Sequence, residues 1–324
     1  MSEQPLAIDI DHLRTWIGRE ECLTDVVSVD LVQKFNATLD LSDEPVRAGD
    51  VAPLLIHFCL APPVVATRLL GHDGHPRKGG FLPPVPLPRR MWAGGRFEFH
   101  GDLRVGDPVS RMSRIVDVQA KQGRTGPLCF VTVEHRLSVD GRLVLIEGQD
   151  IVYLEPATPA TVETTGGMGK GADSGHAGPA AATTTAAAAA ASALAMVDSA
   201  AAPNTAGSAG FSRRMPVGPT LLFRYSALTF NGHRIHYDQP FAVHSEHYPG
   251  LVVHGPMQAT WLIHHAQALK GRRPSRFFFR SQAPLFDNDE IWIHAGADGD
   301  DRHLRLWTSR AGSGPAMVAE AVWA

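Results

Sequence analysis

A long stretch without large side chains most constrains how this chain can fold. Residues 156–213 consist mainly of Ala, Thr, Gly, Ser and Pro, and the only aromatic residue among them is Phe211. Such a segment buries too little apolar surface to offset the conformational entropy lost on ordering. We therefore predict a flexible linker over 156–213, which separates an N-terminal half, 1–155, from a C-terminal half, 214–324.

Both halves show the same order of expected elements, a helix followed by strands. In the N-terminal half the apolar stretch 51–70 predicts a helix that ends at Pro62, and alternating segments between 96 and 155 predict four strands. In the C-terminal half a helix is expected over 256–270, with Pro at its first turn and Gly just after its end, and strands follow over 276–324.

The C-terminal helix is apolar around most of its circumference, which predicts burial. A long apolar helix wrapped by a curved antiparallel sheet is the hot-dog fold. Two such units in one chain predict an α+β protein with a double hot-dog fold, in which the halves pack edge to edge like a homodimer. A faint duplication supports this prediction, because "KFNATLD" at 34–40 resembles "RYSALTF" at 224–230.

Charge, hydropathy and cysteine content restrict the possible partners and compartment. The net charge is -3 and no long basic stripe occurs, so we expect no nucleic-acid partner. No strongly apolar stretch is long enough to cross a membrane. Three scattered cysteines and an acidic N-terminus without a secretory signal are typical of a cytoplasmic protein.

One segment carries a family resemblance. Residues 221–256, "LLFRYSALTFNGHRIHYDQPFAVHSEHYPGLVVHGP", resemble the active-site segment of the MaoC-like (R)-specific enoyl-CoA hydratases. The motif of that family is A-L-S-x-D-x-N-P-x-H followed further on by V-H-G. Here "ALTFNGHRIH" and "VVHG" stand at these positions without gaps. With "GHPRKGGFLPPVPLPRRMWAGGR" at 74–96, the chain is similar to a subgroup that contains mesaconyl-CoA (C-4 thioester) hydratase and hydroxyacyl-thioester dehydratase type 2.

The resemblance implies a hydro-lyase that adds water reversibly to the double bond of a 2-enoyl-CoA thioester, without a cofactor. It also implies an acyl-CoA thioester as the substrate partner and allows a homodimer. His236 keeps the position of the catalytic histidine. The family aspartate is replaced by Asn231, and the family's asparagine and proline by His233 and Arg234. The subgroup shares the asparagine, so we expect an altered mechanism rather than a lost one.

The chemistry of hydration assigns roles to three of these residues. Histidine suits the general base, and later the acid, because its ordinary pKa of about 6.5 lies near working pH. We therefore expect His236 to take a proton from water. Asn231 cannot titrate but can accept a hydrogen bond from that water and orient it. Gly255, at the start of the apolar helix, is expected to offer its backbone N–H to the enolate oxygen. Asp238 is a weaker candidate for tuning the pKa of His236.

Candidate substrate-binding residues come from both halves. Trp92, in "RRMWAGG", could pack against the acyl chain, and Tyr225 lies within the segment that carries the resemblance. Arg280 belongs to a cluster in "GRRPSRFFFR" that could pair with coenzyme A phosphates. A carboxylated acyl group would need a further cation, which Arg234 or Arg90 could supply.

The N-terminal half lacks the polar pair. Aligned without gaps, the position of Asn231 falls on Leu41 and that of His236 on Val46. We therefore expect one active site per chain, to which the N-terminal half contributes a wall and an acyl pocket.

Other readings of these motifs remain open. His-x-x-His occurs twice, at 233/236 and 244/247, but cysteines and carboxylates do not complete a zinc site at matching spacings, so we predict no metal. A mesaconyl-CoA-like substrate is our first choice, and a 3-hydroxyacyl thioester of fatty-acid metabolism is the second. A hot-dog thioesterase and a non-catalytic acyl-CoA-binding protein are the remaining alternatives.

Overall fold

The computed structural model describes residues 8–123, 126–156, 209–296 and 301–324. The predicted linker lies outside these ranges except for its two ends. At its C-terminal end the structure departs from the expected boundary, because residues 209–213 already belong to a strand. They pair with a neighbouring strand of the C-terminal half, and this pairing fixes a stretch whose composition alone indicated no structure.

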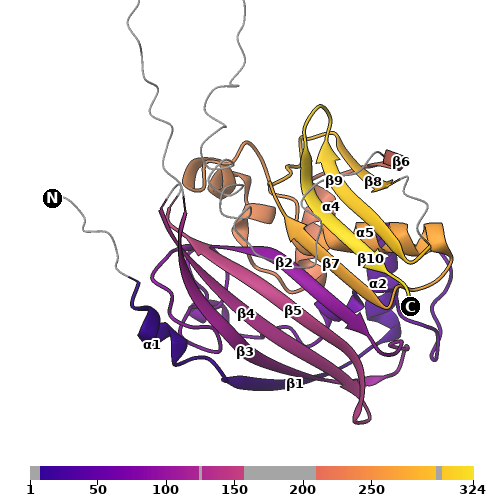
Figure 1. Ribbon diagram of the computed structural model, residues 1–324, viewed down its shortest axis with the longest axis horizontal. Helices are drawn as coiled ribbons and strands as arrows, with labels where there is room; N and C mark the ends of the chain where they lie inside the picture. The colour runs from indigo at the N-terminus through magenta and orange to yellow at the C-terminus, as the bar shows by residue number, and fades with distance from the viewer. Residues whose placement is uncertain (1–7, 124–125, 157–208, 297–300) are drawn as a thin grey trace, which may run out of the picture.

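The described strands form one antiparallel sheet that runs through both halves (Figure 1). Its order is β1-β3-β4-β5-β2-β7-β10-β9-β8-β6, so the two halves meet where β2 pairs with β7. This confirms the predicted edge-to-edge arrangement and the α+β double hot-dog class. The strands are β1 (Glu20–Val26), β2 (Arg89–Phe99), β3 (Pro108–Gly123), β4 (Gly126–Val139), β5 (Arg142–Leu154), β6 (Ala209–Met215), β7 (Arg276–Ser281), β8 (Ile291–Gly296), β9 (His303–Arg310) and β10 (Pro315–Val322).

Aromatic side chains hold the junction between the halves. In the β2–β7 register Phe97 lies opposite Phe277 and Gly95 opposite Phe279. A Cβ atom on Gly95 would lie 2.6 Å from the Phe279 ring, so only glycine lets that ring cover the strand. The rings of Phe97 and Phe279 stack with centroids 6.1 Å apart, and all three phenylalanines are fully buried. The sheet is therefore continuous in packing as well as in hydrogen bonding.

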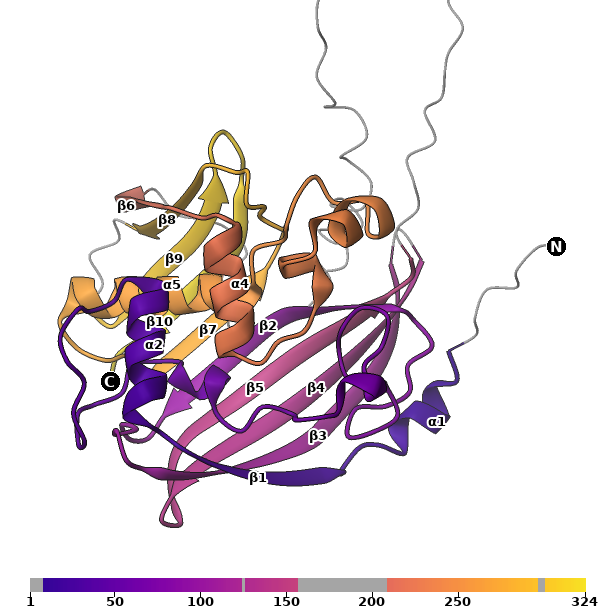
Figure 2. The same ribbon diagram turned by 180° about the vertical axis from the view of Figure 1, so that it is seen from behind.

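Helices cover the sheet mainly in the C-terminal half (Figures 1 and 2). They are α1 (Ile10–Arg14), α2 (Val29–Leu39), α4 (Pro219–Leu228) and α5 (Gly255–Lys270), with 3₁₀ turns η1 (Ile56–Cys59), η2 (Thr67–Leu69) and η3 (Arg234–His236) and a π-helical turn, η4 (Phe241–Ser245). None of the helices in the described ranges is long and apolar enough to span a membrane.

The central helix α5 forms as the sequence predicts. Pro256 lies in its first turn, and Gly271 ends it in the left-handed conformation that favours glycine. Met257, Leu262 and Ile263 are fully buried, and the helix packs against β8, β9 and β10. Apolar residues surround most of the helix because it is enclosed by the sheet and by α4.

The helix expected within the apolar stretch 51–70, ending at Pro62, is wrong. Only the four residues of η1 form a 3₁₀ turn there, and η2 adds a second short turn. Leu55 and Ala61 adopt positive φ angles of 63° and 48°, which an α-helix cannot contain, and Pro62 follows directly. Residues 60–88 instead form a long loop that runs across one face of the N-terminal sheet (Figure 2). The N-terminal half therefore has no long central helix in the described residues.

The two halves nevertheless repeat one order of elements. The stretches 34–40 and 224–230, whose similarity suggested duplication, complete α2 and α4, each of which follows the first strand of its half. The strands predicted over 96–155 and 276–324 are present, with the turn at Asp140 and Gly141 joining β4 to β5. Sequence patterns missed α2, α4 and the short edge strands β1 and β6, because these elements are brief and only partly apolar.

Candidate active site

His236 lies in a buried position at the end of η3. Its Nδ1 atom donates a hydrogen bond to the Val252 carbonyl oxygen at 2.7 Å, which leaves Nε2 as the unprotonated ring nitrogen of the neutral imidazole. Burial lowers the pKa of His236 to about 4, although the hydrogen bond to Val252 acts in the opposite direction. The free imidazole is therefore held neutral and able to accept a proton.

His254 fixes the plane of the His236 ring. The two rings stack with centroids 3.7 Å apart. His254 is fully buried at the cap position of α5, and its Nε2 atom hydrogen-bonds the Ser226 hydroxyl of α4 at 2.8 Å. His254, the histidine of "VVHG", thus supports the proposed base through packing.

Asn231 shapes the turn that precedes His236. Its Oδ1 atom accepts a hydrogen bond from the His233 backbone N–H at 3.0 Å. The backbone N–H of Asn231 donates to the Ser226 carbonyl oxygen at 2.8 Å. The amide oxygen is therefore engaged in an Asx turn, while the amide NH₂ remains the group suited to an external partner. A water held by Asn231 would accept from this NH₂ and donate its own proton elsewhere, which corrects the expectation that Asn231 accepts a hydrogen bond from the water.

Gly255 is the first residue of α5, so its N–H has no partner within the helix. A Cβ atom at this position would meet nothing closer than the Ser281 hydroxyl at 3.9 Å, with the Trp92 carbonyl oxygen at 4.0 Å. These are ordinary van der Waals contacts, so the helix start lies against Ser281 and the backbone of β2. The positive end of the helix dipole lies at this point, which suits a developing oxyanion.

Trp92 brings the N-terminal half to the start of α5. It lies in β2, and its carbonyl oxygen accepts a hydrogen bond from the Ser281 hydroxyl at 3.2 Å. Its ring packs edge-on against Phe58 and near Phe279, with centroids 5.1 and 5.9 Å away. The backbone of Trp92 therefore lies beside the start of α5, while its half-buried indole packs against Phe58 and Phe279.

Tyr225 is fully buried on α4, with its ring 4.9 Å from that of His254. Burial raises the pKa of Tyr225 well above its ordinary value, so its hydroxyl keeps its proton. The structure thus places Tyr225 behind the histidine pair.

The arginines expected to bind coenzyme A do not form one cluster. Arg280 is buried on β7 opposite Gly94, whereas Arg276 is exposed near the start of the same strand. Arg273 pairs with Asp102 of the N-terminal half at 2.6 Å. Strand geometry separates Arg276 from Arg280, and an existing ion pair engages Arg273. A single phosphate site built from these residues is not supported.

Arg234 is not free to bind a substrate carboxylate. Its guanidinium pairs with Asp238 at 2.7 Å, donates to the His72 carbonyl oxygen at 3.1 Å, and lies over the Phe241 ring. Asp238 is engaged by this pair and does not contact His236 through any described interaction. Arg234 therefore joins the two halves, and Asp238 holds it in place.

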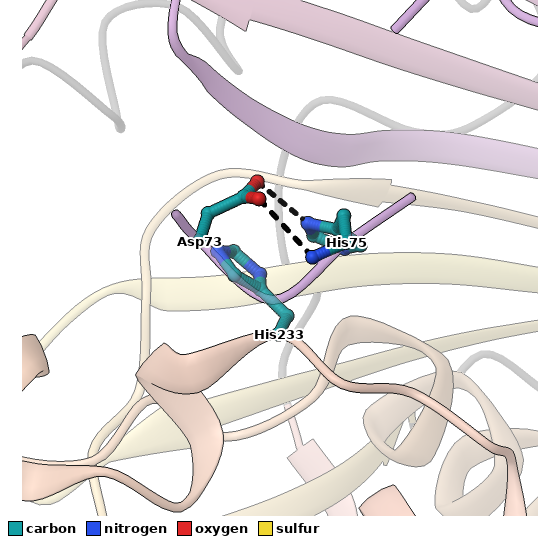
Figure 3. A group of neighbouring side chains, drawn as sticks. All are labelled: Asp73, His75 and His233. Atoms are coloured by element: carbon teal, nitrogen blue, oxygen red, sulfur yellow. Dashed lines mark hydrogen bonds and ion pairs between the residues drawn. The ribbon is translucent and has the colours of Figure 1, made fainter. Parts of the chain in front are cut away.

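The sequence analysis assigned no role to two residues of the N-terminal loop, Asp73 and His75. The Asp73 carboxylate accepts hydrogen bonds from Nδ1 of His75 at 2.8 Å and from the His75 N–H at 3.1 Å, and the His75 ring lies 4.1 Å from that of His233 (Figure 3). Both residues stand in "GHDGH" within the Gly/Pro-rich loop. That spacing resembles an ordinary polar turn, so only the tertiary structure could place it beside the catalytic segment.

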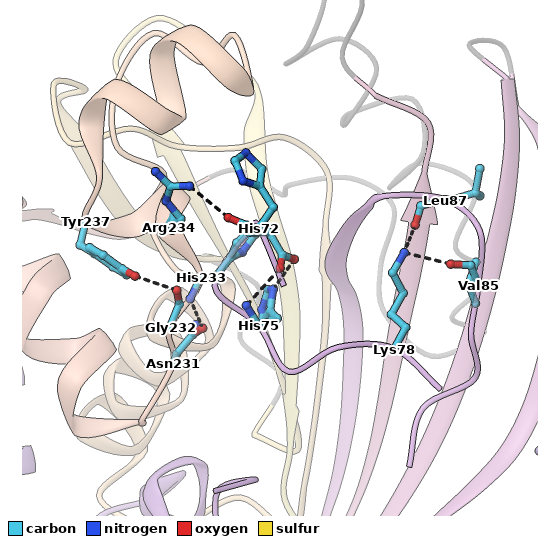
Figure 4. Close-up of polar contacts among 11 residues, drawn as sticks. His72, His75, Lys78, Val85, Leu87, Asn231, Gly232, His233, Arg234 and Tyr237 are labelled. Carbon is cyan, nitrogen blue, oxygen red and sulfur yellow. Dashed lines mark hydrogen bonds and ion pairs between the residues drawn. The ribbon is translucent and has the colours of Figure 1, made fainter. Parts of the chain in front are cut away.

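A tight contact holds this loop against the segment that carries His236. The Arg234 N–H donates to the Asp73 carbonyl oxygen at 2.9 Å (Figure 4 shows the surrounding contacts). A Cβ atom on Gly74 would lie 1.9 Å from the Gly232 carbonyl oxygen, so the approach requires glycine at position 74. Gly74 also has a φ of 88°. The active-site segment and the N-terminal loop are therefore built as one unit.

Asp73, His75 and His233 together also have the composition of a metal site. Their ligand atoms all lie within 4.8 Å of one another. Two features disfavour a cation there. The carboxylate is already occupied by His75, and the positive charges of Arg90 and Lys78 lie close enough to affect this group. We assign no metal to these residues.

A separate cavity of about 420 Å³ lies beside α2 and the last turns of α5, and its lining does not include Asn231, His236 or Gly255. Leu41, one of the two N-terminal residues aligned with the polar pair, lines it together with Ser42, His57 and His264. By the ungapped alignment, the cavity thus includes the N-terminal position that corresponds to Asn231.

Comparison with protein families and curated proteins identifies relatives over most of the chain. The family model described as hydroxyacyl-thioester dehydratase type 2 matches residues 55–185 and 169–287. The chain is 39% identical over 285 residues to mesaconyl-C(4)-CoA hydratase of Chloroflexus aurantiacus, covering 88% of this chain and 89% of the relative. It is 36% identical over 95 residues to the mitochondrial hydroxyacyl-thioester dehydratase type 2 of Schizosaccharomyces pombe, covering 28% and 30% of the two chains.

Solved structures agree in fold. A MaoC-like dehydratase from Phytophthora capsici superimposes with a TM-score of 0.63 at 14% identity, covering 98% of this chain and 99% of that one. A protein from Mycobacterium tuberculosis described as having a double hot-dog fold gives a TM-score of 0.51 at 16% identity, covering 94% and 96%. At these identities the likeness concerns the fold alone.

Proposed function

Because the chain belongs to the hydroxyacyl-thioester dehydratase type 2 family of MaoC-like double hot-dog hydro-lyases, we propose that it hydrates a carboxylated 2-enoyl-CoA such as mesaconyl-C(4)-CoA, with His236 as the base. Acting on acyl thioesters as a hydratase or dehydratase is the family's activity. The observation that carries the proposal is the orientation of His236, whose Nδ1 is committed to the Val252 carbonyl while Nε2 is free.

In the proposed reaction, water attacks the β-carbon of the enoyl thioester. The water accepts a hydrogen bond from the Asn231 amide and gives its proton to Nε2 of His236 as the new C–O bond forms. Electrons of the double bond move to the thioester oxygen, which the Gly255 N–H and the positive end of α5 stabilise. The imidazolium then returns the proton to the α-carbon. Dehydration follows the same steps in reverse.

The environment of His236 suits this cycle. In the free protein, burial favours the neutral imidazole, so the base is ready without prior deprotonation. The negative charge that develops on the substrate oxygen favours the imidazolium as the reaction proceeds, because opposite charges attract strongly in a site with little water. Burial disfavours the imidazolium form of His236 in the free protein, but the negative charge on the substrate oxygen stabilises it in the transition state.

The carboxylated substrate is favoured by the extent of similarity to mesaconyl-C(4)-CoA hydratase, which covers most of both chains. A 3-hydroxyacyl thioester of fatty-acid metabolism is the second candidate, supported by similarity over a shorter region. A thioesterase role is disfavoured because α5, "GPMQATWLIHHAQALK", contains no carboxylate.

A substrate panel tests the proposal. The purified protein is mixed with mesaconyl-C(4)-CoA, crotonyl-CoA and a long-chain 2-enoyl-CoA, and loss of the conjugated double bond is followed by absorbance. We expect hydration, with the highest kcat/KM for the carboxylated thioester. Hydration only of the long-chain thioester would favour the second candidate. Release of free thiol without hydration, or no reaction with any thioester, would contradict the proposed function.

A further inference from the structure

Four imidazole rings form a contiguous row through the candidate site. The row begins at His75 in the N-terminal loop and continues through His233 and His236 to His254 at the cap position of α5. Successive ring centroids lie 4.1, 5.4 and 3.7 Å apart, distances at which aromatic rings contact one another. The proposed base is therefore the third member of a row that starts in the other half of the molecule.

Hydrogen bonds fix the two ends of this row. The Asp73 carboxylate accepts from Nδ1 of His75 at 2.8 Å and from the His75 N–H at 3.1 Å (Figure 3). At the other end, Nε2 of His254 hydrogen-bonds the Ser226 hydroxyl at 2.8 Å. The His233 ring lies between these anchored positions, where it packs against the neighbouring rings. The position of the His233 ring therefore depends on where His75 is held.

The turn that carries His75 is fastened to the segment that carries the proposed base. The Gly71 N–H donates to the His75 carbonyl oxygen at 2.7 Å, which closes the turn. Within the turn, the Asp73 carbonyl oxygen accepts from the Arg234 N–H at 2.9 Å. Arg234 precedes His236 by two residues, so the backbone of the turn is bonded directly to the backbone of η3. Movement of the turn would therefore move the groups around His236.

All four rings of the row are neutral at neutral pH. Burial lowers the pKa of His75 to about 4, the charge of Arg90 acts in the same direction, and Asp73 opposes both. Burial is also the first cause that lowers the pKa of each of the other three rings. Neutrality of the neighbours matters because His236 becomes an imidazolium in the proposed reaction, and a second cation beside it would repel that charge.

We propose that Asp73 and His75 of the N-terminal loop position the proposed base, by holding the His233 ring against His236. The two residues thereby keep the free Nε2 of His236 aimed at the substrate and shield the His236 ring from water. This inference rests on the proposed hydratase function and adds to it a pair of positioning residues, which act through His233 and not on the substrate itself.

The orientation of His236 shows why a second support is needed. A single hydrogen bond at Nδ1 fixes one atom of the ring and leaves the ring free to tilt. His254 lies nearly parallel to the ring, at 18°, whereas His233 stands perpendicular to it, at 89°, so the two neighbours oppose tilting in different directions. Misplacement of a reacting group by about 1 Å can cost about a hundredfold in rate.

The test removes the His75 ring and measures hydration of the thioester that the wild-type protein prefers in the substrate panel, over a range of pH. His75→Ala should lower kcat about thirtyfold and leave KM within about twofold of wild type. Water that enters the vacated space should raise the pKa of His236 toward its ordinary value. Because the neutral ring is the active form, the acid limb of kcat/KM should move to higher pH.

Two further variants separate the ring from its anchor. His75→Phe keeps an aromatic ring against His233, so it should recover most of the kcat that His75→Ala loses. Asp73→Ala leaves the His75 ring in place but removes both hydrogen bonds that orient it. That variant should lower kcat by about tenfold and move the acid limb in the same direction as His75→Ala.

His72→Ala is the matched control. His72 belongs to the same loop but is exposed, and its ring packs against Phe241 with centroids 5.3 Å apart, so its replacement should leave kcat and the acid limb unchanged. A wild-type kcat in folded His75→Ala, an acid limb that does not move, or an equal fall in His72→Ala would overturn the inference and leave the hydratase function intact. If His75→Ala does not fold, Asp73→Ala decides by the same criteria. Failure of the wild-type protein to hydrate any thioester of the panel would overturn the proposed function and this inference together.

Discussion

The two halves of the molecule share an order of elements but differ in what occupies their centres. The C-terminal half encloses the sixteen-residue helix α5, whereas the N-terminal half has the four-residue turn η1 at the corresponding place. The segment after α4 carries Asn231 and His236, while the aligned positions after α2 are Leu41 and Val46. One half therefore holds the candidate proton-transfer residues, and the other holds none of them.

The N-terminal half instead contributes a long loop and the inner face of its sheet. Where a central helix would have filled the sheet, residues 60–88 form a loop that brings Asp73 and His75 against the catalytic segment. The inner face of this sheet carries Trp92 and Arg90, both partly buried. In the proposed function, the proton-transfer residues thus belong to one half, and the other half contributes the loop and the sheet face beside them.

The largest expected effect comes from removing the proposed base of the C-terminal half, and it is a fall in the rate of hydration. His236→Ala removes the proposed base and should lower kcat about a thousandfold, within the range typical of general acid–base catalysis. Hydration is measured by loss of enoyl absorbance, and a thermal melt on the same sample checks folding. His236→Gln, which occupies more of the cavity, serves as a second variant. A rate within tenfold of wild type in both folded variants would point to a different base.

Acid should weaken the C-terminal half more than the N-terminal half. Burial lowers the pKa of His236 and His264 to about 4. It also lowers the pKa values of His233, His254, His265 and His294 in the C-terminal half, whereas in the N-terminal half it lowers those of His75 and His135. An unfolded chain binds protons near pH 6.5 and the folded chain does not, so stability is present above that pH and is lost as pH falls toward 4. His236 alone contributes on the order of 3 kcal/mol to this loss.

Urea unfolding at several pH values measures this loss, and hydrogen exchange locates it. His264→Gln provides a control, since glutamine can still donate to the Leu54 carbonyl oxygen, which lies 3.0 Å from Nε2 of His264, yet does not titrate. That variant should show a shallower dependence of unfolding free energy on pH. A dependence as steep as that of wild type, or exchange that rises first in β3–β5, would contradict the comparison.

Replacing the buried His57 of the N-terminal half should change the free energy of unfolding rather than kcat. His57 of η1 hydrogen-bonds Glu147 of β5 at 3.1 Å, and both side chains are buried. Burial alone would raise the pKa of Glu147, but the hydrogen bond and charge of His57 help to hold it below the ordinary value. His57→Leu leaves a buried carboxylate with a lost partner, so the free energy of unfolding should fall by about 3 kcal/mol.

Chemical unfolding measures that change, with His100→Leu as the matched control. His100 is exposed and lies 3.9 Å from the exposed carboxylate of Glu98, so its loss should leave the unfolding midpoint unchanged. Both variants should retain the wild-type kcat. A large drop in kcat for folded His57→Leu, with little change in stability, would show that the N-terminal half takes part in proton transfer.

The regular elements were predictable from sequence, whereas the loop of the N-terminal half and its contacts were not. Apolar periodicity and strand alternation predicted α5 and most of the sheet, because those elements are long and their burial pattern is regular. The same signal predicted a helix within 51–70 that ends at Pro62, where positive φ angles at Leu55 and Ala61 produce a turn and a loop instead. The motif located Asn231, His236 and Gly255 within one segment. Asp73, His75 and the environment of Arg90 depend on contacts between distant segments, and no local pattern encodes those contacts.

The smallest expected effect concerns the cavity between α2 and the last turns of α5. Leu41, which aligns with Asn231, lines this cavity. If each chain has one active site, filling this cavity should leave catalysis unaffected. Ser42→Tyr places a large side chain at its edge and should keep kcat/KM within about twofold of wild type, as expected for a substitution remote from the chemistry. A fall of tenfold or more, with the thermal melt unchanged, would show that the cavity communicates with the catalytic centre or binds part of the substrate, and the two halves would then be less divided in function than their structures indicate.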